Sequence, residues 1–339
     1  MTNSDPDIVV LRKGTEGLST ESYAKAIRDR LPDHAVVLAR TPYQELELVE
    51  NARVVTGTSI TDDLVNAASN LELFVAASSG YNHLPMDELT QRGVYVSNAA
   101  GIHAPGIAEQ AIGYCLTFAR RLHEGWSRKQ NAQWRHYKAN EFTGSTVTVV
   151  GLGAIGRAFV QRLRGMDVHT IGVRYTPEKD GPTDEVIGFD DRDFHEALSR
   201  TDYLVLSTPL SDTTRGLVGE SELATLPPEG VVINVCRGGV LDTDALLRSV
   251  QKEEIRGAAM DVTDPEPLPA DHPLWKMDNV LITPHMGGHT PKHWDRLADI
   301  LAENVRKLDE GDAGSLRNQV NEPAASESRT EPLHTSSDE

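Results

Sequence analysis

Three charged side chains that follow apolar runs of this sequence are of the types that could act together on a carbonyl group. Arg237, Glu266 and His285 each stand within a few residues of the end of such a run. A guanidinium can hold a carboxylate and polarise a neighbouring carbonyl, and an imidazolium can protonate a developing alkoxide. A carboxylate beside the imidazole keeps it charged and oriented. Hydride transfer to a 2-oxo acid requires these groups, although spacing alone leaves a surface or structural role open for each.

Two further histidines compete with His285 as the proton donor. His103 stands in the Gly/Ala/Pro-rich segment 99–106, which we predict to be a hinge, and His289 follows closely after His285. A gating or solvated role suits His103 better. The histidines lack Cys or Asp partners at metal-ligand spacing, so we predict no metal site.

A glycine-rich turn indicates what would lie beside these groups. The β-branched run 147–150 ends in Gly151-Leu-Gly153-Ala154-Ile155-Gly156, and a helical segment and a second apolar run, 169–173, follow. Strand, glycine turn and helix in this order predict a dinucleotide-binding unit whose helix N-terminus faces the pyrophosphate. A purely structural glycine turn is the alternative.

The end of the second strand indicates which coenzyme binds. A free ribose 2′-hydroxyl requires an acidic residue about 20 positions after the first glycine. Arg174, Tyr175 and Thr176 occupy that position, and the first carboxylate after them is Glu178. Because a guanidinium pairs well with a phosphate, we predict a preference for NADP(H). The alternative is that Arg174 stacks on the adenine and that NAD(H) is also accepted.

Strands alternate with helices along most of the chain, which predicts α/β units with parallel sheets. The first unit precedes residue 100, and the loop 77–81 follows one of its strands. The second unit begins near Thr146 and contains six predicted strands. A single long helix is predicted from Ile107 to about Gln133, either as a subunit interface or as a core helix. A helix from Pro291 to Leu308 is predicted to pack on the first unit, and residues 321–339 are predicted to be a disordered tail.

The composition limits the possible partners. The chain has 339 residues and a net charge of −18, from 51 acidic and 33 basic residues, of which only 9 are Lys. Such a surface disfavours nucleic acid and anionic membranes as partners. An acidic, lysine-poor composition suggests a halophilic cytoplasm, where salt screens the self-repulsion, and an ordinary acidic cytosolic protein is the alternative. The two cysteines, Cys115 and Cys236, lie in apolar segments and are predicted to be reduced.

The sequence resembles the D-isomer-specific 2-hydroxyacid dehydrogenase family over nearly its whole length. The matching stretches in chain order are 149–156, 209–217, 233–242, 259–262 with 266–268, and 283–287. The resemblance implies that Arg237 binds the substrate carboxylate, that His285 donates the proton and that Glu266 is its partner. Ser79 and Gly80 match the loop whose backbone N–H groups hold the same carboxylate, and Tyr81 is expected to shape the pocket. Asp261 matches a residue beside the nicotinamide, and we also assign coenzyme contacts to Thr208, Pro209, Val235, Cys236, Gly287 and Gly288.

The resemblance further implies two open, doubly wound domains with a cleft between them. Residues 1–103, completed by 288–320, would form a flavodoxin-like substrate domain, and 104–287 a Rossmann coenzyme domain. The family is usually dimeric, and residues 107–134 would supply the interface, with Trp134 near a neighbouring subunit's pocket. The implied activity is the reversible NADPH-dependent reduction of a 2-oxo acid to a D-2-hydroxy acid. The alternatives are a glyoxylate or hydroxypyruvate reductase and, more remotely, a nucleotide-sensing scaffold without activity.

Overall fold

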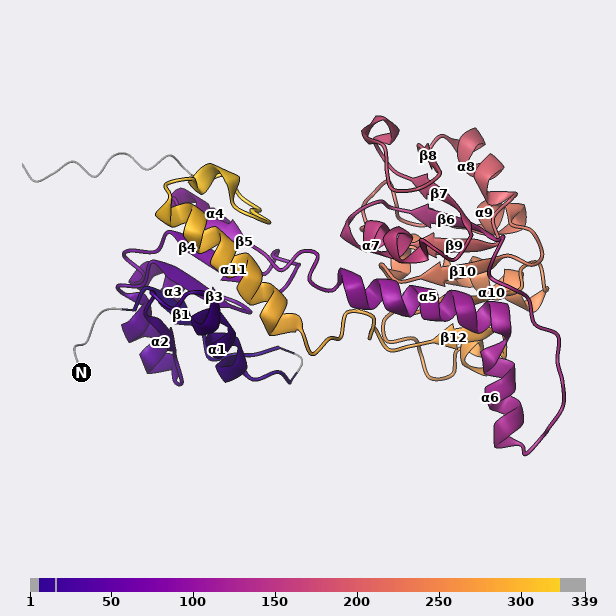
Figure 1. The fold of residues 1–339 in the computed structure, drawn as a ribbon, viewed down its shortest axis with the longest axis horizontal. Coiled ribbons are helices and arrows are strands. Elements are labelled where there is room, and N and C mark those ends of the chain that lie inside the picture. The colour runs from indigo at the N-terminus through magenta and orange to yellow at the C-terminus, as the bar shows by residue number, and fades with distance from the viewer. Residues whose placement is uncertain (1–5, 16, 324–339) are drawn as a thin grey trace, which may run out of the picture. The chain divides into compact units, whose positions relative to one another are not determined.

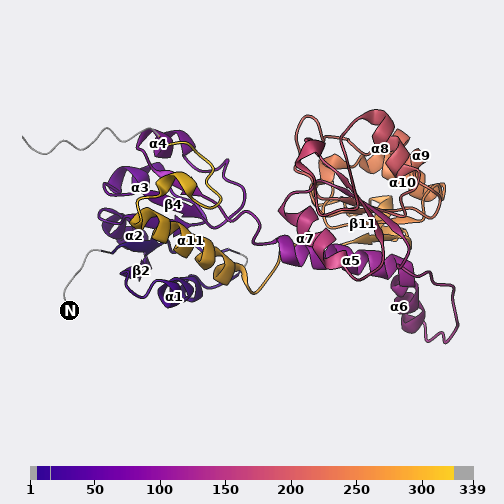
Figure 2. The same ribbon diagram turned by 45° about the horizontal axis from the view of Figure 1, so that its top comes forward.

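The structure is a computed structural model and describes residues 6–15 and 17–323. The described residues divide into two compact units, one formed by residues 6–15, 17–102 and 291–323 and the other by residues 103–290 (Figures 1 and 2). Each unit contains a parallel sheet with helices on its faces, so the predicted pair of α/β domains is confirmed. No helix within the described ranges is long and apolar enough to cross a membrane.

The first unit is built on a five-stranded parallel sheet in the order β2-β1-β3-β4-β5. Its strands are β1 (Ile8–Val10), β2 (Val36–Leu38), β3 (Val54–Gly57), β4 (Leu73–Ala76) and β5 (Tyr95–Ser97). Its helices are α1 (Thr20–Arg30), α2 (Pro42–Val49), α3 (Asp62–Ala67), α4 (Met86–Gln91) and α11 (His293–Asp309). The helices α2 and α4 were not predicted from the sequence.

Alternation along the strands sends apolar side chains to both faces of this sheet. Ile8 and Val10 pack in one core cluster with residues of α1 and α11, whereas Val9 packs in a second cluster with residues of α2, α3 and α4. Both faces are therefore covered, as the nearly continuous apolar runs of the strands require.

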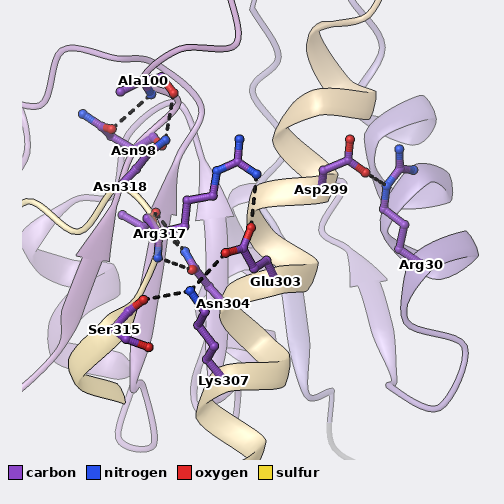
Figure 3. Close-up of polar contacts among 11 residues, drawn as sticks. Arg30, Asn98, Ala100, Asp299, Glu303, Asn304, Lys307, Ser315, Arg317 and Asn318 are labelled. Carbon is purple, nitrogen blue, oxygen red and sulfur yellow. Dashed lines mark hydrogen bonds and ion pairs between the residues drawn. The ribbon is translucent and has the colours of Figure 1, made fainter. Parts of the chain in front are cut away.

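The helix α11 joins the first unit although it follows the whole second unit in the sequence. The rings of Tyr23 and Trp294 stack with their centroids 4.6 Å apart. Asn304 donates to Ser97 Oγ at 3.0 Å. Arg30 binds Asp299 at 2.6 Å (Figure 3). These contacts fix the return of the chain to the first sheet.

The predicted tail differs from the structure at its first residue. The side-chain oxygen of Asn321 accepts from Val96 N at 2.8 Å, and its amide nitrogen donates to Val94 O at 2.9 Å. These bonds hold Asn321 against β5, because an amide side chain can replace a neighbouring strand at a sheet edge. Residues 324–339 of the predicted tail lie outside the described residues.

The second unit contains a seven-stranded parallel sheet in the order β12-β11-β10-β9-β6-β7-β8. Its strands are β6 (Thr146–Val150), β7 (His169–Val173), β8 (Glu185–Ile187), β9 (Tyr203–Leu206), β10 (Val231–Asn234), β11 (Gly257–Met260) and β12 (Val280–Ile282). The edge strand β8 is the addition to the six predicted strands. Its helices are α5 (Ala104–Arg120), α6 (Leu122–Gln130), α7 (Ala154–Leu163), α8 (Asp191–Leu198), α9 (Glu220–Thr225) and α10 (Thr243–Gln251).

The prediction of a single long helix from Ile107 to about Gln133 is wrong, because the structure has two helices there. The backbone of Arg121 has φ 50°, in the left-handed region, and this residue separates α5 from α6. Many side chains of α5 are buried, and α5 packs against α7, whereas α6 buries none of its residues. One face of α5 therefore belongs to the core, and the more exposed part of the stretch is α6 with the segment that follows it.

Candidate functional site

The glycine turn joins β6 to α7 as predicted. Gly151 has φ +97°, and a Cβ there would lie 2.8 Å from Thr208 N, so only glycine fits this turn. A Cβ on Gly156 would lie 2.0 Å from the carbonyl oxygen of Gly151, which explains why α7 can approach the strand so closely. Gly153 faces open space at its Cβ position. Ala154 and Ile155 form the first turn of α7.

A cavity of about 440 Å³ opens beside this turn, within the second unit. Seven residues predicted for the coenzyme site line it, namely Gly151, Gly153, Arg174, Tyr175, Thr176, Thr208 and Pro209. Leu152, Phe189, Ser211, Thr213 and Thr214 line it as well and were not predicted. The cavity lies where a doubly wound sheet changes strand order, between β6 and β9, which is where such sheets bind nucleotides.

The residues around this cavity fit a dinucleotide. The open approach to Gly153 and the free N-terminus of α7 suit a pyrophosphate. Arg174 lies at the end of β7, where the ribose of a nucleotide bound to the turn would be. Its guanidinium donates to the carbonyl oxygen of Asp180, a contact that leaves its other N–H groups for a ligand.

The candidate proton-transfer residues, Glu266 and His285, lie at the carboxyl edge of the same sheet. Glu266 follows β11, and His285 follows β12, the strand that pairs with it. His285 Nδ1 and Glu266 Oε1 are 2.6 Å apart. Both side chains are partly exposed, 48% for His285 and 42% for Glu266. The pair can therefore reach a ligand, with Nε2 of the imidazole as the free nitrogen.

A second cavity of about 300 Å³ lies against this pair. Leu268, Trp275 and Ile282 give it an apolar wall, and Asp261 and Thr283 add polar groups. An imidazole and a carboxylate at the rim of a partly apolar cavity can exchange a proton with a bound molecule from which water is partly excluded.

Arg237 lies at the end of β10, the strand next to β11. Its side chain is exposed, and one of its guanidinium nitrogens donates to Cys236 O at 2.6 Å. Asn234, which is 1% exposed, shapes this turn, because its amide donates to Arg237 O and its oxygen accepts from Cys236 N. Burial raises the pKa of the Cys236 thiol to about 11, so this side chain is not a nucleophile at neutral pH.

The remaining predicted coenzyme residues lie along the ends of β10, β11 and β12 and do not line the 440 Å³ cavity. They are Val235, Cys236, Asp261, Gly287 and Gly288. Asp261 is 3% exposed and accepts from Met286 N and Gly287 N, both at 2.8 Å. His103 Nδ1 lies 2.6 Å from Gly288 O, so this competing histidine is turned toward the backbone after β12.

Ser79, Gly80 and Tyr81 belong to the first unit, at the carboxyl end of β4. Ser79 and Gly80 are exposed, and the loop is fixed by Ser78, which donates to Gly80 O at 2.7 Å, and by Asn98, which donates to Ser79 O at 2.7 Å. Tyr81 packs partly against the core. In both bonds the loop accepts through a carbonyl oxygen, so neither bond uses a backbone N–H group of Ser79 or Gly80.

Several residues around the candidate site could not have been found from sequence patterns. Gln110, Tyr114 and Thr283 surround the Asp261 carboxylate, and Asn234 shapes the Arg237 turn. The only sequence signal was polarity inside otherwise apolar segments, as at Gln110 in α5. In the part of the chain that the structure describes, no group of three or more His, Cys, Asp or Glu side chains could hold a metal ion.

Comparison with known proteins gives a consistent result. Residues 112–287 match the family model of the D-isomer specific 2-hydroxyacid dehydrogenase, NAD binding domain. A glyoxylate reductase of Thermofilum pendens is 33% identical over 253 residues, which cover 73% of this chain and 74% of the relative. A D-3-phosphoglycerate dehydrogenase of Methanocaldococcus jannaschii is 30% identical over 303 residues, and the match covers 88% of this chain but 57% of that protein.

A solved structure shares the fold. The D-isomer specific 2-hydroxyacid dehydrogenase of Xanthobacter autotrophicus, in complex with NADPH and MES, superposes with a TM-score of 0.73 and 24% identity. The match covers 94% of this chain and 98% of that one. The relatives named here are dehydrogenases and a reductase.

Proposed function

Because the chain belongs to the D-isomer specific 2-hydroxyacid dehydrogenase family, a family of oxidoreductases, we propose that it interconverts a 2-oxo acid and a D-2-hydroxy acid. The observation that carries this proposal is the hydrogen bond of 2.6 Å between His285 and Glu266. Both residues follow strands of the seven-stranded sheet, which also carries the 440 Å³ cavity beside the glycine turn, called the nucleotide cavity below. In the direction of reduction the reaction is 2-oxo acid + NADPH + H⁺ to D-2-hydroxy acid + NADP⁺.

The bound coenzyme supplies the hydride, and the residues of this chain supply binding and the proton. Glu266 accepts from Nδ1 of His285, which orients the imidazole and leaves Nε2 to protonate the alkoxide as it develops. Arg237 binds the substrate carboxylate and polarises the carbonyl. The exposed backbone of Ser79 and Gly80 holds the same carboxylate, and Tyr81 borders the substrate side chain.

The test is a turnover assay with a panel of 2-oxo acids, NADPH or NADH, and high potassium chloride. We expect reduction by the unmodified chain and a loss of about 10²-fold to 10⁴-fold in kcat for His285→Asn, since general acid catalysis contributes this much. An unmodified, folded and coenzyme-binding chain that reduces none of the 2-oxo acids would instead support a nucleotide-sensing scaffold.

We propose NADP(H) as the preferred coenzyme, with NAD(H) as an alternative. The position of Arg174 at the end of β7 and in the lining of the nucleotide cavity supports this choice. Thr176 lines the same cavity and offers a hydroxyl for the phosphate. Arg174→Asp should lower the ratio of kcat/KM for NADPH to that for NADH by at least about tenfold, because the variant replaces a charge-assisted contact by repulsion. An unchanged ratio would show that Arg174 does not read the 2′-phosphate.

A glyoxylate or hydroxypyruvate reductase is the second candidate, favoured by the 33% identity to a glyoxylate reductase. The residues at the reacting centre would be the same, and only the substrate side chain would differ. Comparison of kcat/KM for glyoxylate, hydroxypyruvate and larger 2-oxo acids separates the two candidates.

We also propose that the chain forms a homodimer through residues 107–134. Two exposed tryptophans, Trp126 (62%) and Trp134 (98%), support this proposal, together with Leu122 (52%). A cytoplasmic location with high salt is proposed from the acidic composition and from the two buried free cysteines.

A further inference from the structure

Three successive backbone N–H groups after β12 donate hydrogen bonds to one residue, Asp261, which directly follows β11. The N–H of His285 donates to Asp261 O at 2.8 Å, and the N–H groups of Met286 and Gly287 donate to the Asp261 carboxylate, each at 2.8 Å. His285 has φ 53°, in the left-handed region that a non-glycine residue avoids. The hydrogen bonds to Asp261 therefore hold the turn that carries the imidazole in an otherwise unfavourable conformation.

The Asp261 carboxylate is in turn held by side chains from another element. Gln110 of α5 donates from Nε2 to Asp261 Oδ1 at 2.8 Å. Thr283 donates its hydroxyl to the same oxygen, and Tyr114 of α5 contacts that hydroxyl. Gln110 Nε2 also lies 2.7 Å from Tyr114 Oη. A carboxylate only 3% exposed is thus surrounded by neutral donors.

The donor and the acceptor of each hydrogen bond in this network can be assigned. Burial raises the pKa of Tyr114, so its hydroxyl keeps its proton and can donate to Thr283. Thr283 then donates to Asp261. Gln110 Nε2 lies within hydrogen-bond distance of three acceptors, namely Tyr114 Oη, Asp261 Oδ1 and Thr283 Oγ1. The hydrogen bonds that run from Tyr114 through Thr283 therefore end on the carboxylate.

The helix α5 is a rigid base for this network. Ala108, Ala111, Cys115 and Phe118 on its inner face are buried in the core of the second unit. Gln110 and Tyr114 lie one helical turn apart, so both reach the same side of β11 and β12. A Cβ on Gly287 would lie 2.8 Å from Asp261 Oδ2, so the close approach of the turn to the carboxylate depends on this glycine.

We propose that Gln110 and Tyr114 are positioning residues for His285: they fix the Asp261 carboxylate, which fixes the turn 285–287 and the direction of the imidazole. The inference rests on the proposed function in so far as His285 is the proton donor there. Because proton transfer depends steeply on the placement of the donor, a looser turn should slow the reaction.

Two variants test the inference. Tyr114→Phe removes one hydroxyl, and Gln110→Met removes both donors at similar volume. Thr117→Val is the matched control, since Thr117 is on the same helix and its hydroxyl donates to Gly113 O at 2.7 Å, away from Asp261. Hydrogen exchange of the amides 285–287, measured by NMR or by mass spectrometry of a peptide spanning them, reports on the turn directly. Steady-state kinetics of 2-oxo acid reduction reports on its function.

We expect exchange at 285–287 to become about tenfold faster in both variants, because the carboxylate that binds these amides loses donors of its own. We expect kcat to fall by about tenfold in both variants, because the turn that carries the proton donor is held less firmly. Thr117→Val should match the unmodified chain in both measurements. Unchanged exchange, or faster exchange with unchanged kcat, overturns the inference.

A failure of the proposed function would give a different experimental result from a failure of this inference. An unmodified chain without any turnover of 2-oxo acids would contradict the activity, whereas the exchange measurement would still decide whether Gln110 and Tyr114 hold the turn. Lowered thermal stability with no change in exchange at 285–287 would assign the two residues a purely structural role and would overturn the inference.

Discussion

At the scale of single residues, the candidate chemistry depends on the contact between His285 and Glu266. The imidazole has one nitrogen occupied by the carboxylate at 2.6 Å and one free for a substrate. In the reduction direction the imidazole must be charged, and in the oxidation direction it must be neutral. Reduction is therefore expected to weaken as pH rises and oxidation to strengthen over the same range.

Replacing the carboxylate tests this arrangement. In Glu266→Gln we expect kcat for reduction to fall by about 10-fold to 100-fold, because an amide holds Nδ1 of the imidazole less firmly than a carboxylate does. The measurement is a pH–rate profile in both directions. The control is Glu229→Gln, an exposed Glu that is 3.9 Å from Arg256 and far from the pair in sequence. A profile identical to that of the unmodified chain would contradict the role of Glu266.

At the scale of elements, the sheet edge β7–β8 depends on an ion pair as well as on packing. β8 has only three residues, all partly exposed. Its first residue, Glu185, binds Arg200 through two nitrogens and lies 2.6 Å from His169 Nε2. These hydrogen bonds, with that to Arg200 the strongest, lower the pKa of Glu185 from 4.5 to about 2.

The stability contributed by Glu185 should depend on pH in a defined direction. A lowered pKa in the folded state means that the contribution is complete above pH 4.5 and disappears as pH falls toward 2. Glu185→Gln should lower the free energy of unfolding at pH 7 by no more than about 1 kcal/mol, because the pair is exposed and solvent screens it. Thermal melts of both proteins across this pH range measure the difference. A difference that persists undiminished at the acidic end would contradict this account.

The hydrophobic pattern of the sequence predicted the apolar strands well and gave little signal for strands that are partly exposed and polar. The strands β6, β7, β9, β10 and β11 are mainly buried apolar runs and could be predicted. The strand β12 could be predicted as well, since it is an apolar run, although only Val280 in it is buried. The strand β8 follows a polar segment with Gly and Pro and lacks a buried face, so no apolar pattern marks it. The break at Arg121 was missed because an Arg in the left-handed region carries no sequence signal comparable to glycine.

At the scale of the whole molecule, the net charge of −18 is expected to influence stability. Acidic side chains outnumber basic ones by 51 to 33, so the folded state repels itself more strongly than the expanded chain does. Salt at about 1 M reduces the Debye length to about 3 Å and screens this repulsion.

We therefore expect Tm to rise with potassium chloride between about 0.1 M and about 2 M. The measurement is a thermal melt at each salt concentration. Sucrose at equal osmolality is the control, because it stabilises by exclusion from the surface without screening charge. A Tm that is independent of salt, or that rises equally with sucrose, would count against electrostatic self-repulsion.

The proposed dimer is also a property of the whole molecule. Trp134→Ala and Trp126→Ala should weaken self-association, because they remove the most exposed large apolar side chains of residues 107–134. Light scattering over a range of protein concentrations measures the change. The control is Trp275→Ala, which removes an exposed tryptophan outside this region. An unmodified chain that stays monomeric at all protein concentrations would contradict the proposed dimer.

The sequence by itself determined the local features of this protein. The glycine turn 151–156, the alternation of strands and helices, and the positions of Arg237, Glu266 and His285 after strands are all read from neighbouring residues. The family follows from the same motifs, since each is a short stretch whose chemistry depends on spacing within it.

Only the tertiary structure decided which distant groups meet. Gln110 binds Asp261 across 151 positions of sequence, Asn304 reaches Ser97 across 207, and even His285 and Glu266 are 19 positions apart. The physical reason is that a hydrophobic period or a glycine constrains the backbone near itself. A hydrogen bond between remote side chains depends on the path of the whole chain, which no local pattern specifies.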